Sequence, residues 1–314
     1  MKEQKISIII PCKAIDGYTK ECMEKCKHLD YNNYEIIVLP DSGTKKISGA
    51  KIIPTGNVPP GKKRNIGLEN SSGEFLAFID NDAYPRKDWL RNAAKYFENG
   101  DVAAVGGPGI TPEEDGLMQK AGGNILSSFM VGGISRRFKI KGVVESDDIH
   151  SCNFIARRTM LEKVKWNEKY WPGEDTLMCL GIKKLGGRML EAPDVIVYHH
   201  RRPLFRKHLK QVSQYGLHRG FFAKKFPENS FRSTYLLPSL ILLFLIFGGI
   251  FSLFIPLIKN LFITFLAVYA FTALYASLNK DAKLIAPIWL GIILTHLTYG
   301  LYFLIGLSKK ELRR

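Results

Sequence analysis

Two carboxylates one residue apart follow an apolar stretch in the first third of the chain. The stretch Phe75–Ile79 has the composition of a buried strand, and Asp80-Asn81-Asp82 comes directly after it. Paired acids repel each other unless a cation lies between them, and carboxylate oxygens suit Mg²⁺ or Mn²⁺, with a diphosphate able to complete the shell. A solvated turn would explain the same short string in most proteins. Its position directly after an apolar strand favours the metal site.

Two other acidic positions also follow or precede predicted elements. Asp41 ends the apolar stretch that begins at Tyr34, where its carboxylate could accept hydrogen bonds from the base or ribose of a nucleotide. An ordinary Asx turn is the alternative. Glu174 and Asp175 open a helical stretch, a place where capping and the helix dipole favour acids without any catalytic role.

The surroundings of the Glu174-Asp175 pair favour a binding site. Tyr170 and Trp171 precede it, and Ser151-Cys152-Asn153 is expected to end an earlier strand-like segment. Aromatic rings and a few polar groups together could form a pocket for a polar, ring-shaped ligand.

Two imidazoles and two guanidiniums follow the last predicted strand of the first 200 residues. They are His199, His200, Arg201 and Arg202. Arginine forks bind phosphate bidentately, so the pair could hold the phosphates of a ligand. A basic face close to a membrane is an equally good explanation.

The elements that must position these residues alternate between short β-branched stretches and helical ones. This rhythm predicts β-α-β units on a mostly parallel sheet, and ligands of such sheets bind beyond the carboxyl ends of the strands. The predicted strands are Ile6–Ile10, Glu35–Leu39, Lys51–Ile53, Phe75–Ile79 and Val102–Val105. The predicted helices are Gly17–Leu29, Pro60–Asn70, Lys87–Phe97 and Asp175–Leu185.

The composition indicates a soluble domain joined to a membrane domain. The chain has 314 residues and a net charge of +16, and three long uncharged apolar runs lie near its end, at 233–258, 260–278 and 284–308. Each run approaches or exceeds the ~20 residues that cross a bilayer. Buried helices of a large soluble protein are the alternative.

The charge is concentrated beside the first of these runs. Nine Lys and Arg residues and one acid lie between His199 and Arg232. Such a basic segment beside a membrane span favours a position at the cytoplasmic leaflet. It also explains the positive net charge without any binding of nucleic acid. Three spans would, however, place the basic tail 309–314 on the outside, against the same rule. One apolar run would then be re-entrant, or the first span alone would set the orientation.

The beginning of the chain and its cysteines agree with a cytoplasmic catalytic part. Only five or six apolar residues follow the start at Met1, fewer than a secretory signal needs. The five cysteines are odd in number and have no C-x-x-C spacing, which indicates reduced thiols.

The ordered series of motifs resembles glycosyltransferase family 2, the inverting enzymes with a GT-A fold that use sugar nucleotides. The resemblance covers about Lys5 to His200. One departure is that the family's usual acid-acid-glycine-serine run reads Leu39-Pro40-Asp41-Ser42-Gly43, with one acid missing. The strings that carry the resemblance are Ile8-Ile9-Ile10-Pro11, Asp41, Gly61 to Gly67, Gly73 to Asp82, Ser151 to Asn153 and Gly173-Glu174-Asp175.

The resemblance implies roles for individual residues. Asp82 would bind Mn²⁺ or Mg²⁺, with His199 or His200 as a further ligand, because some relatives use a histidine there. Asp175 would be the general base, while Glu174, Trp171 and Asn153 would serve the acceptor or support it. On the donor side the resemblance and the phosphate argument place Pro11, Asp41, Arg64, Asn65, Asp80, Arg201 and Arg202.

The resulting expectation is an inverting transfer of sugar from a nucleotide diphosphate sugar, with UDP as the expected nucleotide, to a hydroxyl of a lipid-linked or polysaccharide acceptor. The expected organisation is a cytoplasmic catalytic domain at 1–200, a basic membrane-proximal segment at 201–232, about three spans at 233–308 and a basic tail. A polyprenyl-phosphate glycosyltransferase or a processive synthase is the alternative within the class. A nucleotidyltransferase is a remote one, because Pro11-Cys12-Lys13 lacks the glycines of its phosphate loop.

Overall fold

The computed structural model describes residues 3–43, 47–131 and 137–312. Residues 313 and 314 of the expected basic tail lie outside the described part. The chain divides into two compact units. The first contains the residues up to Pro112 together with Arg137–His200, and the second contains Glu113–Arg136 together with Arg201–Arg314. The expected boundary after residue 200 coincides with this division, whereas the segment around 113–136 belongs to the second unit.

The first unit is built on an eight-stranded sheet with the order β3-β2-β1-β4-β9-β6-β10-β8. Strands β1, β2, β3 and β4 run parallel, and β9 is antiparallel to both of its neighbours. This is the expected mixed, mostly parallel α/β fold. The strands are β1 (Ile6–Pro11), β2 (Tyr34–Leu39), β3 (Lys51–Ile52), β4 (Phe75–Phe78), β6 (Val102–Gly106), β8 (Val144–Glu145), β9 (Phe154–Arg157) and β10 (Arg188–Glu191).

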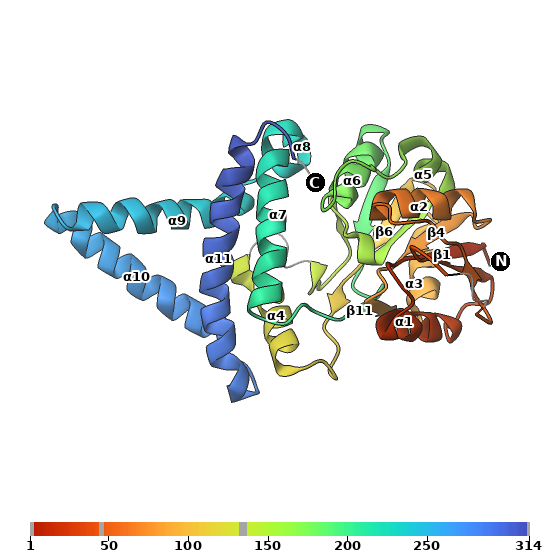
Figure 1. The fold of residues 1–314 in the computed structure, drawn as a ribbon, viewed down its shortest axis with the longest axis horizontal. Coiled ribbons are helices and arrows are strands. Elements are labelled where there is room, and N and C mark those ends of the chain that lie inside the picture. The colour runs from red at the N-terminus through yellow and green to blue at the C-terminus, as the bar shows by residue number, and fades with distance from the viewer. Residues whose placement is uncertain (1–2, 44–46, 132–136, 313–314) are drawn as a thin grey trace. The chain divides into compact units, whose positions relative to one another are not determined.

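Helices cover both faces of this sheet (Figure 1). Residues of α1 (Gly17–Lys27) and α3 (Trp89–Tyr96) pack on one face. Residues of α2 (Pro60–Glu69), α5 (Arg158–Val164) and α6 (Glu174–Lys184) pack on the other. Because both faces are covered, the central strands are apolar on both sides, and β1 is buried at every position.

A small second sheet, with the order β5-β11-β7, lies at the carboxyl ends of the main strands and brings distant segments together. It consists of β5 (Ala83–Pro85), β7 (Gly109–Ile110) and β11 (Val197–His199). Strand β11 pairs antiparallel with β5, so that His199 lies opposite Ala83. This pairing places Ala83, the residue after Asp82, beside strand β11, which carries His199.

One sequence expectation about local structure is wrong. Ser151–Asn153 does not end a strand but forms a single 3₁₀ turn that precedes strand β9. All five cysteines are free and buried.

The second unit is helical. It contains α4 (Leu117–Ser127), α7 (Arg206–Lys225), α8 (Pro227–Ser230), α9 (Ser233–Ser252), α10 (Pro256–Ser277), the 3₁₀ turn η3 (Ala282–Leu284) and α11 (Ile285–Ser308). The three predicted apolar runs coincide with α9, α10 and η3–α11, and all three are long and apolar enough to cross a membrane. Helix α10 starts earlier than its run because Pro256 is favoured in the first turn of a helix.

Candidate active site

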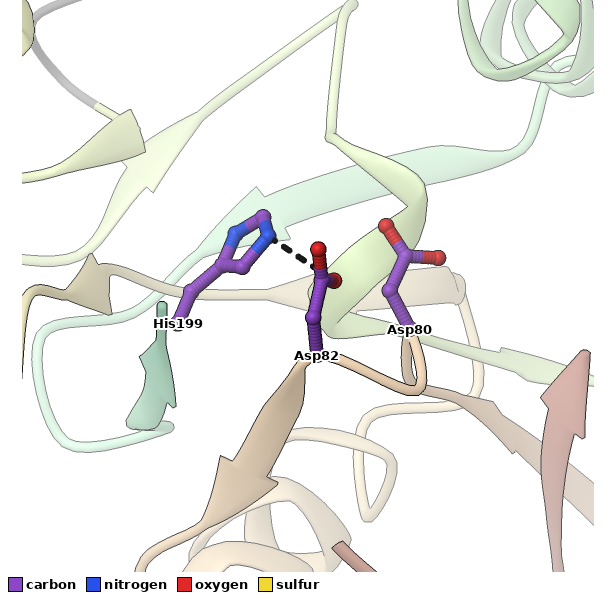
Figure 2. Close-up of side chains that lie close together, drawn as sticks. All are labelled: Asp80, Asp82 and His199. Carbon is purple, nitrogen blue, oxygen red and sulfur yellow. Dashed lines mark ion pairs between the residues drawn. The ribbon is translucent and has the colours of Figure 1, made fainter. Parts of the chain in front are cut away.

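Three potential metal ligands converge where β4 ends and β5 begins (Figure 2). One ligand atom each from Asp80, Asp82 and His199 lies within 4.8 Å of the others. Asp82 is buried, and its Oδ1 lies 3.2 Å from Nε2 of His199. Two carboxylates and an imidazole fit a divalent cation that binds both oxygen and nitrogen ligands. Mn²⁺ accepts such a mixed set of ligands more readily than Mg²⁺ does.

The second imidazole does not join this group. Nε2 of His200 lies 3.0 Å from Oε2 of Glu21, and its ring packs against Tyr18 with 4.6 Å between centroids. The physical reason is that successive side chains along a strand point to opposite faces. Among the described residues, the structure therefore brings only His199 of the predicted histidine pair to the two aspartates.

A single buried arginine connects the end of β4 with the start of α6. Arg64 of helix α2 donates from Nη2 to Asp80 at 3.0 Å and from Nη1 to Glu174 at 2.7 Å. It also donates to Ser151 Oγ at 2.9 Å, and its guanidinium lies 4.8 Å from the centroid of the Trp166 ring. A planar guanidinium can hold two carboxylates in a fixed geometry, so the donor-side acids and the acids of α6 are positioned together.

The two acids at the start of α6 have different surroundings. Glu174 is buried, and burial raises its pKa to about 7, although the nearby charge of Arg64 opposes the shift. Asp175 is partly exposed, and its Oδ1 accepts a hydrogen bond from the Thr176 amide. Glu174 is thus enclosed by protein, whereas Asp175 can be reached by a ligand.

A second arginine lies beside Asp175. Nη1 of Arg137 is 4.0 Å from Asp175 Oδ2, and its Nη2 is 2.8 Å from Asp148 Oδ2. The buried Asp148 also accepts a hydrogen bond from Thr176 Oγ1 at 2.9 Å. Asp148 therefore ties Arg137 to the first turn of α6.

The residues predicted to bind the nucleoside lie at the carboxyl ends of β1 and β2. Pro11 is the last residue of β1, and Asp41 follows β2 and forms an ion pair with Lys63. The buried Lys63 ammonium also donates to the backbone carbonyls of Cys12 at 2.8 Å and Leu39 at 3.1 Å. One lysine thus joins both strand ends to the carboxylate, and it orients Asp41.

Two of the predicted site residues are held inside the protein. Asn65 donates to the Trp166 carbonyl at 2.9 Å and accepts from its amide at 2.8 Å. Asn153 is fully buried, accepts from Trp89 Nε1 at 2.8 Å and donates to the Val195 carbonyl at 2.7 Å. These contacts suit a supporting role for both side chains.

Trp171 belongs to the first unit, whereas Arg201 and Arg202 belong to the second. Trp171 is 56% exposed in the turn before α6. The Arg201 amide donates to Asp115 Oδ2 at 3.3 Å. The role of the two arginines at the donor phosphates stays a prediction.

Sequence reasoning missed several contacts that support the site, namely those of Lys63, Ser151, Arg137 and Asp148. Lys63 and Ser151 lie inside strings that carry the family resemblance, but the strings do not reveal the contacts of these two side chains. Arg137 and Asp148 lie in segments without a recognisable pattern, and only the folded chain brings them to the site.

The chain matches a known family. The model for "Glycosyl transferase family 2" matches residues 7–165. A similar curated protein is the dolichyl N-acetyl-alpha-D-glucosaminyl phosphate 3-beta-D-2,3-diacetamido-2,3-dideoxy-beta-D-glucuronosyltransferase of Methanococcus voltae, 24% identical over 320 residues that cover 95% of this chain and 96% of that one.

Two more comparisons agree with this family. The poly(ribitol-phosphate) beta-N-acetylglucosaminyltransferase TarS of Staphylococcus aureus (strain Mu50) is 27% identical over 122 residues, which cover 34% of this chain and 21% of TarS. Among solved structures, the mannosyltransferase PcManGT from Pyrobaculum calidifontis, in complex with GDP-Man and Mn²⁺, matches with a TM-score of 0.67 and 16% identity over 98% of this chain and 88% of that one. This structural likeness confirms the GT-A fold.

Proposed function

The chain belongs to glycosyltransferase family 2, and from that premise we propose that it transfers a sugar from a nucleotide diphosphate sugar to a hydroxyl of a lipid-linked saccharide, with inversion at the anomeric carbon. The observation that carries the proposal is the contact of Arg64 with both Asp80 and Glu174. It holds the acids expected on the donor side beside the acids expected on the acceptor side, as a single displacement requires.

In this proposal Asp80, Asp82 and His199 would hold Mn²⁺ or Mg²⁺ for the donor diphosphate. A cation bound there would neutralise the negative charge that develops on the leaving diphosphate. The imidazole in the group favours Mn²⁺. The presence of Mn²⁺ and GDP-Man in the PcManGT complex supports a metal and a sugar nucleotide on this fold.

Asp175 is the proposed general base. It lies at the start of α6 and is partly exposed, so that an acceptor hydroxyl could approach its carboxylate. Asp175 would take the proton as the hydroxyl attacks the face of the sugar opposite the leaving group, and no covalent intermediate would form. Glu174 would keep Arg64 in place, and the exposed Trp171 would stack on the acceptor sugar.

The proposed donor is a UDP-sugar, recognised at Asp41. Lys63 holds this carboxylate against the ends of β1 and β2, where a nucleoside base would bind. The orientation of Asp41 supports base recognition, and it makes Asp41 the residue to test for nucleotide choice.

The lipid-linked acceptor is supported by two independent features. The Methanococcus voltae relative, which matches almost the whole chain, is named for a dolichyl-linked aminosugar phosphate. The apolar helices α9, α10 and α11 suit a membrane anchor. The basic residues between His199 and Arg232 favour the cytoplasmic face for the catalytic unit.

The test is a transfer assay with the full-length protein in membranes. UDP-, GDP- and dTDP-sugars carrying a radiolabel would be screened with extracted membrane lipids as acceptor, and the anomeric configuration of the labelled product would be determined by NMR. We expect one labelled lipid-linked product from a UDP-sugar, with inverted configuration, and transfer by Asp175→Asn that is slower by ~10²- to 10⁴-fold. Retained configuration, or undiminished transfer by Asp175→Asn, would refute the mechanism.

A further inference from the structure

Helix α11 is covered by protein to a much greater extent than the other two apolar helices. Within the most apolar part of each helix, 39% of α11 is buried, compared with 17% of α9 and 11% of α10. The exposed surfaces of α9 and α10 are rich in large apolar side chains, such as Phe247 at 52% and Phe271 at 71%. Helices α9 and α10 therefore present the apolar surface that lipid would cover, whereas much of α11 is already covered by its own chain.

The basic helix α7 lies along α11, and the two run in the same direction (Figure 1). Near the start of α7, His208 hydrogen-bonds Thr295 in the middle of α11 at 3.0 Å. Near their ends, Lys224 donates to the Leu307 carbonyl at 2.9 Å. In between, the backbones touch at Gly220, where a Cβ atom would come within 2.0 Å of the Phe303 carbonyl oxygen. Helix α11 therefore cannot change its depth or tilt without α7.

Helix α7 is too polar to lie inside a bilayer. It carries six Lys and Arg residues, and its central turns hold Gln211, Ser213, Gln214 and His218. Lysine and arginine at the ends of a helix can reach the interface, but polar side chains in the middle of a spanning helix have no water to bind. If α11 crossed the membrane, α7 would have to enter it beside the second half of α11.

Helices α9 and α10 touch α11 mainly with the ends that are joined to the rest of the unit. Ser239 of α9 donates to the Gly300 carbonyl at 3.0 Å, and Trp289 of α11 donates to the Ala270 carbonyl of α10 at 3.1 Å. From these contacts the two helices lead away from α11 and meet at their far ends, near Leu253 (Figure 1). They form a hairpin, and α11 lies across its base.

The opposite flank of α11 is covered by α4 as well as by α7. A Cβ atom on Gly291 of α11 would come within 2.4 Å of Ile125 Cδ1 in α4. Asn124 of the same helix accepts a hydrogen bond from Asn279 at 3.0 Å. Helix α11 thus lies between the basic helix α7 and the apolar hairpin.

We propose that only the α9–α10 hairpin enters the bilayer, and that α4, α7 and α11 form a layer that docks on the headgroups of one lipid leaflet. The parts of α9 and α10 that lead away from α11 run from Ser239 to Ser252 and from Pro256 to Ala270, and each is ~20 Å long. The hairpin therefore reaches about two-thirds of the way through the ~30 Å hydrocarbon core and returns the chain to its starting side. The tail residues Lys309 and Lys310 then lie on the same side as α7, in agreement with the positive-inside rule.

The proposal concerns attachment to the membrane and does not depend on the transfer reaction. Its test compares the sidedness of two engineered cysteines in the full-length protein, since the five native cysteines are all buried. Lys163→Cys reports on the catalytic unit and Lys310→Cys on the tail, and both lysines are exposed. Each variant would be treated with a membrane-impermeant maleimide in intact cells and in inverted vesicles.

We expect both cysteines to be labelled in the same preparation and to lose labelling together in the other one. Three crossings would instead place them on opposite sides, so labelling of Lys163→Cys and Lys310→Cys in different preparations would overturn the proposal. The comparison needs no assumption about which side the catalytic unit occupies.

A second measurement tests α11 directly with a matched pair of substitutions at exposed leucines. Leu261 lies in the part of α10 that is remote from α11, and Leu301 lies within α11. Leu261→Lys places a charge deep in the hydrocarbon core and should abolish carbonate-resistant membrane insertion. Leu301→Lys places the same charge at the headgroups and should leave insertion at the wild-type level. Equal loss of insertion in both variants would show that α11 crosses the membrane and would refute the proposal.

Discussion

The candidate site contains two pairs of acids, and they differ in the basic side chain beside them. Asp80 and Asp82 lie beside an imidazole, His199, whereas Glu174 and Asp175 lie beside the guanidiniums of Arg64 and Arg137. A neutral imidazole can bind a metal, but an arginine stays protonated and has no lone pair to offer. One pair is therefore suited to take a cation from solution, and the other is neutralised by the protein itself.

Arg64 joins the two pairs because it contacts Asp80 on one side and Glu174 on the other. Asp80 consequently belongs to both regions, which makes Asp82 and Asp175 the residues that distinguish them. Two similar acidic strings in the sequence thus have different neighbours, and under the proposed function the neighbouring basic side chain decides which task each string has. The following substitutions test this division.

The largest effect is expected at Asp82. Asp82→Asn keeps the shape of the side chain but removes a charged ligand, so transfer should fall ~10⁴-fold or below detection. Manganese binding, measured by electron paramagnetic resonance on the purified full-length protein, should be lost in the same variant. EDTA should abolish wild-type activity, and Mn²⁺ should restore it. Full activity in EDTA would remove the metal from the mechanism.

The next largest effect is expected at Asp175. Asp175→Asn keeps the hydrogen bond at the start of α6 but cannot accept a proton, so turnover should fall ~10²- to 10⁴-fold. Donor affinity, measured by calorimetry, should stay close to that of the wild type, in contrast to Asp82→Asn. If donor affinity fell as far as turnover, Asp175 would belong to the donor site and the division between the two pairs would fail.

A smaller effect should separate the two neighbouring histidines. His199→Gln removes one potential ligand and should weaken metal binding at least about 10- to 100-fold, the range found when residues that only support the ligands are changed. His200→Gln is the matched control, because His200 pairs with Glu21 instead, and it should leave metal affinity unchanged. Equal weakening of metal binding in both variants would show that His199 is not a specific metal ligand beside Asp80 and Asp82.

The smallest effect concerns pH and Glu174. Burial raises the pKa of this carboxyl from 4.5 to about 7, so acidification through pH 7 protonates it and removes a negative partner of Arg64. Transfer by the wild type should fall roughly fivefold below this pH, equivalent to about 1 kcal/mol. Glu174→Gln should lack this step in a pH profile of kcat/KM. An unchanged acid limb would assign the titration to another group.

The same shift has a consequence for stability with the opposite sign. A raised carboxyl pKa means that the folded protein binds the proton more tightly than the unfolded chain does, so the contribution of Glu174 to stability decreases as the pH rises from 4.5 to about 7. Thermal inactivation of Glu174→Gln should accordingly depend less on pH in this interval.

Much of the local structure could be predicted from the sequence. The apolar stretches at Ile6 and Phe75 become β1 and β4, and Pro60 starts α2, because strand composition and helix-start signals act over a few residues. The family resemblance and the mostly parallel sheet are confirmed. Ser151–Asn153 was misplaced because a short apolar context does not distinguish the residue that precedes a strand from the one that ends it.

The sequence by itself determined which segments carry acids, where the strands end and which helices are apolar, since these properties depend on neighbouring residues. Only the tertiary structure decided between His199 and His200, because the antiparallel pairing of β11 with β5 turns one imidazole toward Asp82 and the other toward Glu21. It also decided that α7 accompanies α11, because the close approach at Gly220 requires two backbones separated by about 80 residues in the chain. Contacts between distant residues depend on packing, and no local pattern encodes them.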